Sequence, residues 1–218
     1  MSLLEIRIAL VLGLLVAGIT PAQAESATTA LSVIEQQVTK GRAAKTGYTR
    51  AQFGQTWADV DRNGCDTRND MLKRDLTEIV YKVKTQNCVV ESGILIDRYS
   101  GETINFVRGN VTSMEVQIDH VVALSNAWQT GAFKLSVTQR AALANDPLNL
   151  FAVKGRLNSQ KGDGDAATWL PPLKSFRCTY VAQQIAVKAK YSLWVTVPEK
   201  EAMTRILAAC PKQLLPSN

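Results

Sequence analysis

The stretch that decides the fold reads QIDHVVALSNAWQTGA at residues 117–132 and continues as ANDPLNLFAVKGRLNSQKG at residues 144–162. It holds the one histidine of the 218-residue chain, His120, directly after an acid, Asp119. Histidine is the side chain whose unperturbed pKa lies closest to neutral pH, so proton transfer near neutral pH would rest on His120. The surroundings of this residue are therefore the first question that the sequence raises.

Two strands and a helix are expected around this acid and histidine. Side chains alternate along residues 114–119, which predicts a strand with one apolar and one polar face. The apolar face carries Met114, Val116 and Ile118, and the polar face carries Glu115, Gln117 and Asp119. LNLFAV at residues 148–153 is typical of a short buried strand, and GRLNSQKGD at residues 155–163 of a short helix. Together these stretches predict a β-β-α unit.

The side chains of this unit suit the hydrolysis of a phosphodiester bond, which needs a base to activate water and a cation to neutralise charge. Asp119 and the carbonyl of Asn158 would hold Mg²⁺, or Mn²⁺ in its place, because such ions bind few protein oxygens and keep several waters. Neutral His120 would accept the proton of the water, and Asn149 would hold His120 in place. Because successive strand residues point to opposite faces, Asp119 and His120 converge only if the strand turns there.

The net charge of +6 indicates a polyanionic partner. Residues 134–190, around the second half of the candidate site, contain nine basic and three acidic residues. Phosphate neutralisation dominates affinity for nucleic acids, so DNA, or RNA, is the expected partner. Lys161, which shares the expected helix face with Asn158, and Arg140 are the candidate phosphate contacts. The alternative is a basic face kept for solubility, and charge alone does not separate the two.

The N-terminus predicts export. Arg7 precedes an apolar run at residues 8–19, and AQA at residues 22–24 is typical of a signal-peptide cleavage site, so residues 1–24 would be removed. The run is shorter than the roughly 20 apolar residues of a membrane-spanning helix. The mature chain is thus expected to be secreted or held in the cell envelope, without stable membrane insertion. The alternative is an uncleaved N-terminal anchor, because Glu5 weakens the leading positive charge.

The cysteines fit an exported protein. The chain has four, at Cys65, Cys88, Cys178 and Cys210. They lie far apart and lack the C-x-x-C spacing of zinc sites, so disulfides are the expected state. Pairing Cys65 with Cys88 and Cys178 with Cys210 is favoured because these bonds close the shorter loops. The sequence leaves the other two pairings open.

DVDRNGCDTRND at residues 59–70 resembles the calcium loop of an EF-hand. Its candidate oxygen ligands are Asp59, Asp61, Asn63 and, at the twelfth position, Asp70. The loop departs from the EF-hand pattern at Asp66, where an aliphatic residue is usual, and at its last position, where a Glu is usual. A structural Ca²⁺ is therefore one reading, and an Asn-Gly turn pinned by a disulfide at Cys65 is the other.

The rest of the chain predicts an α+β protein with one mostly helical domain. Residues 25–47 are expected to form a helix and a linker, and residues 48–218 the domain. Tyr48, Phe53 and Trp57 are expected to be core residues on one helix face. Helices are predicted at residues 71–83, 125–132 and 136–146 and over most of the chain after residue 172, β-structure at residues 89–116, and a further strand at residues 192–197. Asp163 and Asp165 are interpreted as helix-end or loop acids.

The motifs I-D-H-V-V-A-L, N-D-P-L-N-L-F-A-V and L-N-S-Q-K-G-D resemble the HNH endonucleases of the ββα-metal group. In particular, the chain is similar to exported bacterial HNH proteins related to the nuclease domain of modification-dependent restriction systems. The similarity runs from about Tyr48 through G-Q-T-W-A-D-V-D-R-N-G-C-D-T-R-N-D to W-L-P-P and R-C-T-Y, which is most of the chain. The resemblance implies a ββα-metal core within a disulfide-bonded domain.

What the family implies for these positions is a metal-dependent endonuclease site. Asp119 and Asn158 would be the metal ligands, His120 the general base, and Asn149 the central Asn that positions the loop. The chain departs from the family name at Asn158, where a histidine is expected, which leaves the identity of the metal open. Two alternatives remain: a non-catalytic exported nucleic-acid-binding protein, and a calcium-stabilised interaction domain organised by residues 59–70.

Overall fold

The computed structural model describes residues 28–110 and 112–216. The predicted signal peptide, residues 1–24, lies outside the described residues. The strands are β1 (Leu76–Tyr81), β2 (Val90–Ile96), β3 (Thr103–Val107), β4 (Val116–His120) and β5 (Leu150–Lys154). The α-helices are α1 (Ala30–Gln36), α2 (Thr67–Asp75), α3 (Leu124–Gln129), α4 (Val137–Asn145), α5 (Gly155–Lys161), α6 (Arg177–Lys190) and α7 (Val197–Ala208). Short 3₁₀ helices lie at η1 (Arg50–Phe53), η2 (Thr112–Met114), η3 (Ala132–Lys134), η4 (Pro147–Asn149) and η5 (Lys174–Phe176).

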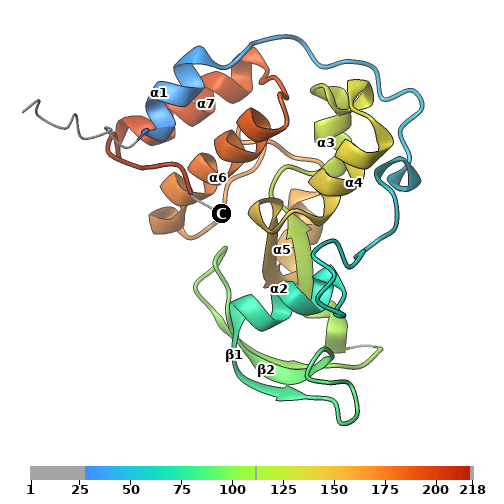
Figure 1. The fold of residues 1–218 in the computed structure, drawn as a ribbon. Helices are drawn as coiled ribbons and strands as arrows, with labels where there is room; N and C mark the ends of the chain where they lie inside the picture. The colour runs from blue at the N-terminus through green and yellow to red at the C-terminus, as the bar shows by residue number, and fades with distance from the viewer. Residues whose placement is uncertain (1–27, 111, 217–218) are drawn as a thin grey trace, which may run out of the picture.

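The protein is a mixed α+β domain in which a two-stranded sheet lies between two layers. Figure 1 shows the antiparallel sheet β1-β2-β3 with α2 at one end of the molecule and α1, α6 and α7 at the other. Strands β4 and β5 pair antiparallel between them, with His120 opposite Leu150 at the last position of β4. Helix α5 follows β5 directly, and α3 and α4 fill the connection between the two strands.

Both faces of β5 are buried, which explains its continuous run of apolar residues. Leu150 and Ala152 pack with Leu72, Leu95 and other residues of α2 and the three-stranded sheet. On the opposite face, Phe151 and Val153 pack into the cluster of the helical layer. Strand β4, which ends in His120, is therefore paired with β5, and β5 packs against both layers.

The two disulfides form as predicted. Cys65 is bonded to Cys88, which ties the segment before α2 to the β1–β2 connection. Cys178 is bonded to Cys210, which ties the start of α6 to the second residue after α7. Loops of 23 and 32 residues correspond to about 3 to 4 kcal/mol of stabilisation each in the chain-entropy treatment. In the described part of the chain no helix is both long and apolar enough to cross a membrane.

Three sequence predictions of secondary structure are wrong. The helix predicted at residues 71–83 ends at Asp75, and Leu76–Tyr81 forms β1, because this β-branched stretch pairs with β2. Residues 192–197 form no strand among the described residues; Val195 makes an isolated bridge to Thr39. Around Phe53 the chain makes only one 3₁₀ turn, so no continuous helix face exists there.

Candidate functional site

A polar pocket of about 230 Å³ lies at the end of β4. It brings together three of the predicted site residues, Asp119, His120 and Asn158. The backbone of β4 ends at His120, and beyond it the chain turns into the loop that leads to α3. The other residues that line it are Tyr48, Arg50, Ile118, Ala123, Leu124, Gly162 and Asp163. Asp119 and His120 both line this pocket, and His120 also lines a smaller neighbouring pocket together with Trp57 and Ala144.

His120 is held as a neutral imidazole. Its Nε2 lies 2.8 Å from the carbonyl oxygen of Ala144, and because a carbonyl only accepts, Nε2 carries the proton and Nδ1 keeps its lone pair. The ring stacks on Trp57, with centroids 5.7 Å apart and planes 11° apart. Burial, with smaller contributions from the charges of Arg50 and Lys161, lowers the pKa of His120 to about 4. The imidazole is therefore uncharged and able to accept a proton at neutral pH.

Asp119 is buried and has a partner on each carboxylate oxygen. Tyr99 donates its hydroxyl to Oδ2 over 2.5 Å, and Lys161 donates its ammonium to Oδ1 over 2.9 Å. Burial, followed by the charge of Asp119, raises the pKa of Tyr99 well above its usual value, so the hydroxyl stays protonated. A carboxylate offers about four lone-pair positions, so two such bonds leave acceptor capacity for a cation or a water.

Lys161 does not lie on the surface where a phosphate contact was predicted. Its side chain is fully buried, and its ammonium also donates to the backbone carbonyl of His120 over 2.8 Å. The helix α5 turns this side chain inward, because Asp119 and the end of β4 supply acceptors that replace water. Lys161 thus fixes Asp119 and the backbone of His120 from behind the pocket.

Asn158 lines the pocket and uses the nitrogen side of its amide for a contact with β4. Its Nδ2 donates to Oε1 of Gln117 over 2.8 Å, and among the described residues no protein donor reaches its Oδ1. The placement of α5 depends on Gly155, its first residue: a Cβ there would lie 1.9 Å from the carbonyl oxygen of Met114. Only glycine lets the helix begin so close to the chain before β4, and this sets where Asn158 lies.

Asn149 lies outside the pocket and ties the loop that follows His120. Its Oδ1 accepts from the backbone N–H of Val122 over 2.8 Å, and its Nδ2 donates to the carbonyls of Val122 and Leu143. Its own carbonyl accepts from the N–H of Val121 over 2.8 Å. These contacts fix the chain immediately after the histidine, and the influence of Asn149 on catalysis stays a prediction.

Arg140 lies away from the pocket, and its side chain is not available to a phosphate. It is 7% exposed, stacks on Trp128, and donates to the carbonyl of Leu135 and, over 2.7 Å, to that of Gln52. Because its donors already have protein acceptors, the predicted phosphate contact is corrected to a structural one. Arg140 holds η1, the turn that carries Arg50, against α4.

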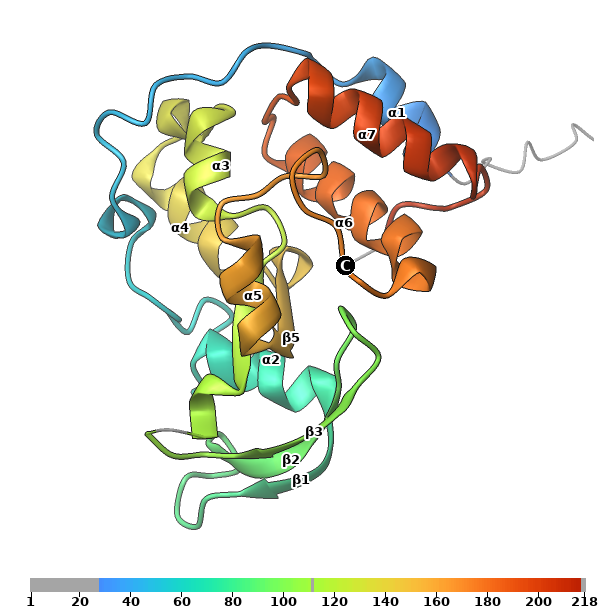
Figure 2. The ribbon, with the colours of Figure 1, turned by 180° about the vertical axis from the view of Figure 1, so that it is seen from behind.

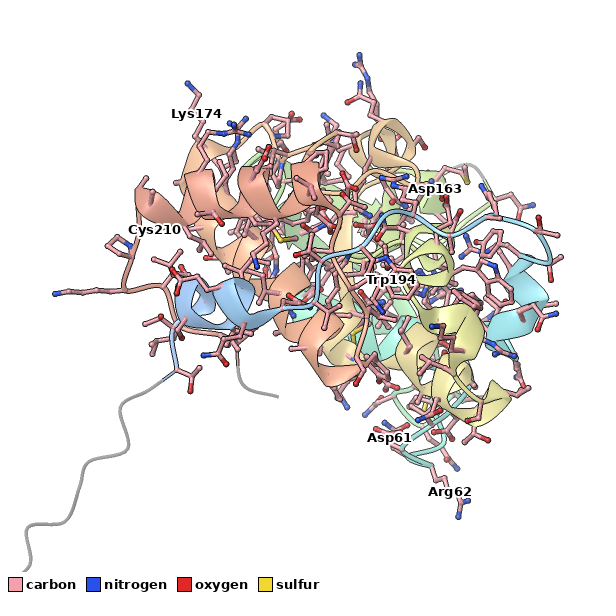
Figure 3. All side chains as sticks on the ribbon, turned by 90° about the horizontal axis from the view of Figure 1, so that it is seen from above. Asp61, Arg62, Asp163, Lys174, Trp194 and Cys210 are labelled. Atoms are coloured by element: carbon pink, nitrogen blue, oxygen red, sulfur yellow. A yellow bond between two sulfur atoms is a disulfide. The ribbon has the colours of Figure 1, made fainter. Side chains whose placement is uncertain are left out.

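The sequence analysis did not assign three polar residues that line the pocket, Tyr48, Arg50 and Asp163, to the site. Two ion pairs fasten the segment before η1 to the chain after α5: Lys45 with Asp163 at 2.9 Å and Arg42 with Asp165 at 2.6 Å. In Figure 3, seen from above, Asp163 lies beside this light-blue segment. Asp163 and Asp165 are thus more than loop acids. The nearest sequence signal was the aromatic spacing of residues 48–57.

Arg50 is the cation of this pocket that has no acidic partner in the part of the chain that is described. Arg50 is exposed, and its charge contributes to the lowered pKa of His120. A cation with this position would attract an anionic substrate to the pocket.

Trp57, predicted as a core residue on a helix, adopts a left-handed backbone instead, with φ of 55°, and is half-buried against His120.

The predicted calcium loop closes on its own hydrogen bonds. Asp59 accepts from the N–H groups of Asn63 and Gly64, while the side-chain amide of Asn63 donates to Asp61 and Asp70. Within the described ranges, no group of three or more His, Cys, Asp and Glu side chains is arranged to hold a metal ion. A calcium ion here stays a prediction, and in the main pocket a metal would rest on Asp119, the amide oxygen of Asn158 and waters.

The fold and the pocket define a disulfide-bonded α+β domain with a buried Asp-His pair at a strand end, beside an asparagine from the following helix. Residues 66–206 match the family of C-terminal domains of GmrSD restriction endonucleases, and the chain belongs to this HNH-like nuclease family. Tyr48 and Arg50 lie before the matched residues. A protein of Arthroderma benhamiae described as an uncharacterized secreted protein is 37% identical over 193 residues, which cover 88% of this chain and 89% of the relative. No solved structure matches the chain.

Proposed function

We propose that the protein is an exported, metal-dependent endonuclease that hydrolyses phosphodiester bonds of DNA. The observation that carries the proposal is the pocket that joins Asp119, neutral His120 and Asn158. Membership of a nuclease family supports nucleic acid as the substrate. The two disulfides, the predicted signal at residues 1–24 and the secreted relative support export.

In this proposal His120 is the general base. Its Nδ1 lone pair accepts the proton of the attacking water, and the bond from Nε2–H to the carbonyl of Ala144 stabilises the imidazolium that results. The stacked ring of Trp57 keeps the imidazole in one orientation. Asn149 and Lys161 hold the backbone that directly follows the imidazole, because Lys161 binds the carbonyl of His120 and Asn149 binds the loop after it.

Asp119 and Asn158 would hold a divalent ion, most simply Mg²⁺. Such an ion, when bound, neutralises the charge that builds on the phosphate and leaving oxygens. Lys161 already offsets the charge of Asp119, so the carboxylate attracts a divalent ion less strongly than an unpaired one would. Arg50 would hold the substrate phosphate, and the negative charge of that phosphate would add to the charge of Asp119. This suits Mg²⁺, which binds through few protein groups.

Plasmid nicking tests the proposal. Purified mature protein is expected to nick supercoiled DNA with Mg²⁺ or Mn²⁺ and to stop when EDTA is added. The variant His120→Ala is expected to lose roughly 10²- to 10⁴-fold in rate, the range of general acid-base catalysis. Lys174→Ala, which changes an exposed cation on η5, is the matched control and should retain the wild-type rate.

The outcomes also separate the two alternative functions. Salt-dependent DNA binding without nicking would identify a binding protein, since neither metal nor His120 would matter to it. A melting temperature that rises with Ca²⁺ alone, without nicking, would identify a calcium-stabilised interaction domain. Full nicking activity in a folded His120→Ala protein would refute the mechanism, because the chain has no other histidine.

A further inference from the structure

A second surface pocket, of about 510 Å³, adjoins the candidate site. Two arginines, Arg68 from α2 and Arg108 from the residue after β3, line it together with Ser113 and Gln117. Gln117 connects the two pockets, because its Oε1 accepts from Asn158, a residue of the candidate site. In Figure 2 the β3–β4 connection lies beside the N-terminal end of α5, where the N–H of Gly155 donates to the carbonyl of Glu115.

Both guanidinium groups are held in place by backbone and amide acceptors. Arg108 donates to the carbonyl of Val90 over 2.7 Å and to Oδ1 of Asn69 over 2.6 Å. Arg68 donates to the carbonyl of Val116 over 3.2 Å. A guanidinium has five N–H donors, so each arginine keeps donors that no protein acceptor takes within residues 28–110 and 112–216. The two side chains are thus ordered in advance of any ligand.

No carboxylate of the described segments forms an ion pair with either arginine. Burial, and next the charge of Arg108, lowers the pKa of Arg68, and the charge of Asp66 offsets this only in part. Elsewhere the protein treats half-exposed arginines differently: Arg74 and Arg98 both pair with Asp75. Two ordered, mutually repelling guanidinium groups that line one pocket form an arrangement that an anionic ligand would stabilise.

We propose that Arg68 and Arg108 bind one backbone phosphate of the nucleic-acid substrate, on a nucleotide that flanks the bond to be cut. The inference rests on the proposed function of the neighbouring pocket. Arginine suits this ligand because its planar fork can make two parallel bonds to phosphate oxygens. The substrate strand then runs from Arg50 past Asp119 and Asn158, and over Gln117, to the two arginines.

DNA binding at several salt concentrations, with a fluorescent duplex in EDTA, tests this subsite without catalysis. Arg68→Gln and Arg108→Gln are each expected to weaken binding, and the double variant is expected to lower the slope of log affinity against log salt by about 0.9, the loss of one neutralised phosphate. Each single variant should lower the slope by less than the double variant, because the remaining arginine still faces the same phosphate. Arg205→Gln, which changes an exposed arginine on α7, is the matched control and should keep the wild-type slope.

Two further variants guard against a purely structural explanation. Arg108 anchors β2 and α2, so Arg108→Gln can lose stability; Arg108→Lys keeps the charge and should keep the slope. Arg68→Gln relieves repulsion and should melt no lower than the wild type. An unchanged slope in the folded double variant would refute the subsite even if the plasmid is nicked, whereas a lowered slope without nicking would refute the nuclease and retain the subsite.

Discussion

The buried neutral state of His120 predicts how the stability of the protein depends on pH. The unfolded chain has a histidine pKa near 6.5, and burial lowers the pKa to about 4 in the fold. Between these values the unfolded state binds more protons than the folded state, so the contribution of His120 to stability is present above pH 6.5 and is lost as pH falls towards 4. A shift of this size corresponds to about 3 kcal/mol.

Urea unfolding in EDTA from pH 7.5 to 4.5, for the wild type and His120→Gln, measures this contribution. Carboxylates also titrate in this range, but they do so in both proteins, so the difference between the two unfolding free energies isolates the histidine. The unfolding free energy of the wild type minus that of His120→Gln should fall by about 2 kcal/mol from pH 7 to pH 4.5. Over most of this range His120 takes up a proton in the unfolded chain but not in the folded protein. Glutamine keeps a polar, uncharged group at the site and is the closest neutral replacement.

A direct measurement accompanies the unfolding experiment. Because the chain has one histidine, its imidazole gives one set of proton signals, and their titration reports the pKa of His120 without assignment. A pKa near 6.5 in the folded protein, or a free-energy difference that does not change with pH, would refute the buried neutral histidine. It would also remove the structural reason for treating Nδ1 as a base at neutral pH.

Two further predictions concern the placement of the pocket residues. Lys161→Met removes the buried partner of Asp119 and is expected to cost about 3 to 5 kcal/mol in urea unfolding; in protein that still folds, calorimetry should show tighter Mg²⁺ binding, and unchanged stability would contradict the pairing. Gly155→Ala would bring a Cβ to 1.9 Å from Met114, so α5 must shift and both stability and nicking should fall, whereas Gly41→Ala, with no atom within 4 Å, should behave as the wild type.

The strand-strand-helix unit was predictable because its signals are local. Within the strand that it forms, LNLFAV has no polar residue that would face water. A continuous apolar run of this kind is typical of a strand buried on both faces. The disulfide pairing was also predictable, since the shorter loops hold each bond within one layer of the fold. By contrast, the four-residue spacing of Leu72, Leu76 and Val80 fits a helix as well as a strand. Pairing with β2, some 20 residues further on, decided that Leu76 begins a strand.

The positions of long charged side chains were not predictable from local sequence. Lys161 has the spacing of a surface residue on α5, yet its partner, Asp119, lies 42 residues earlier in the chain. The same ambiguity applies to Arg140, whose acceptor, the backbone carbonyl of Gln52, lies 88 residues earlier in the chain. Such contacts depend on which elements the fold brings together, and a lysine or arginine stem is long enough to point either way.

This is why the basic segment at residues 134–190 does not mark the surface that we propose to bind the substrate. Several of its cations are used within the protein: Arg140, Lys161 and Lys188 are buried, while Lys154 and Lys190 pair with Glu102 and Asp146. The arginines that face the two pockets, Arg50, Arg68 and Arg108, come from the chain before it and lack ion pairs among the described residues. A cation that stabilises the fold gains from a carboxylate beside it, whereas one that binds phosphate must keep its charge uncompensated until the ligand arrives. The combination of a charge left unpaired within the described ranges with a place in the wall of a pocket, rather than local charge density, is therefore the reason we propose Arg50, Arg68 and Arg108 as phosphate contacts.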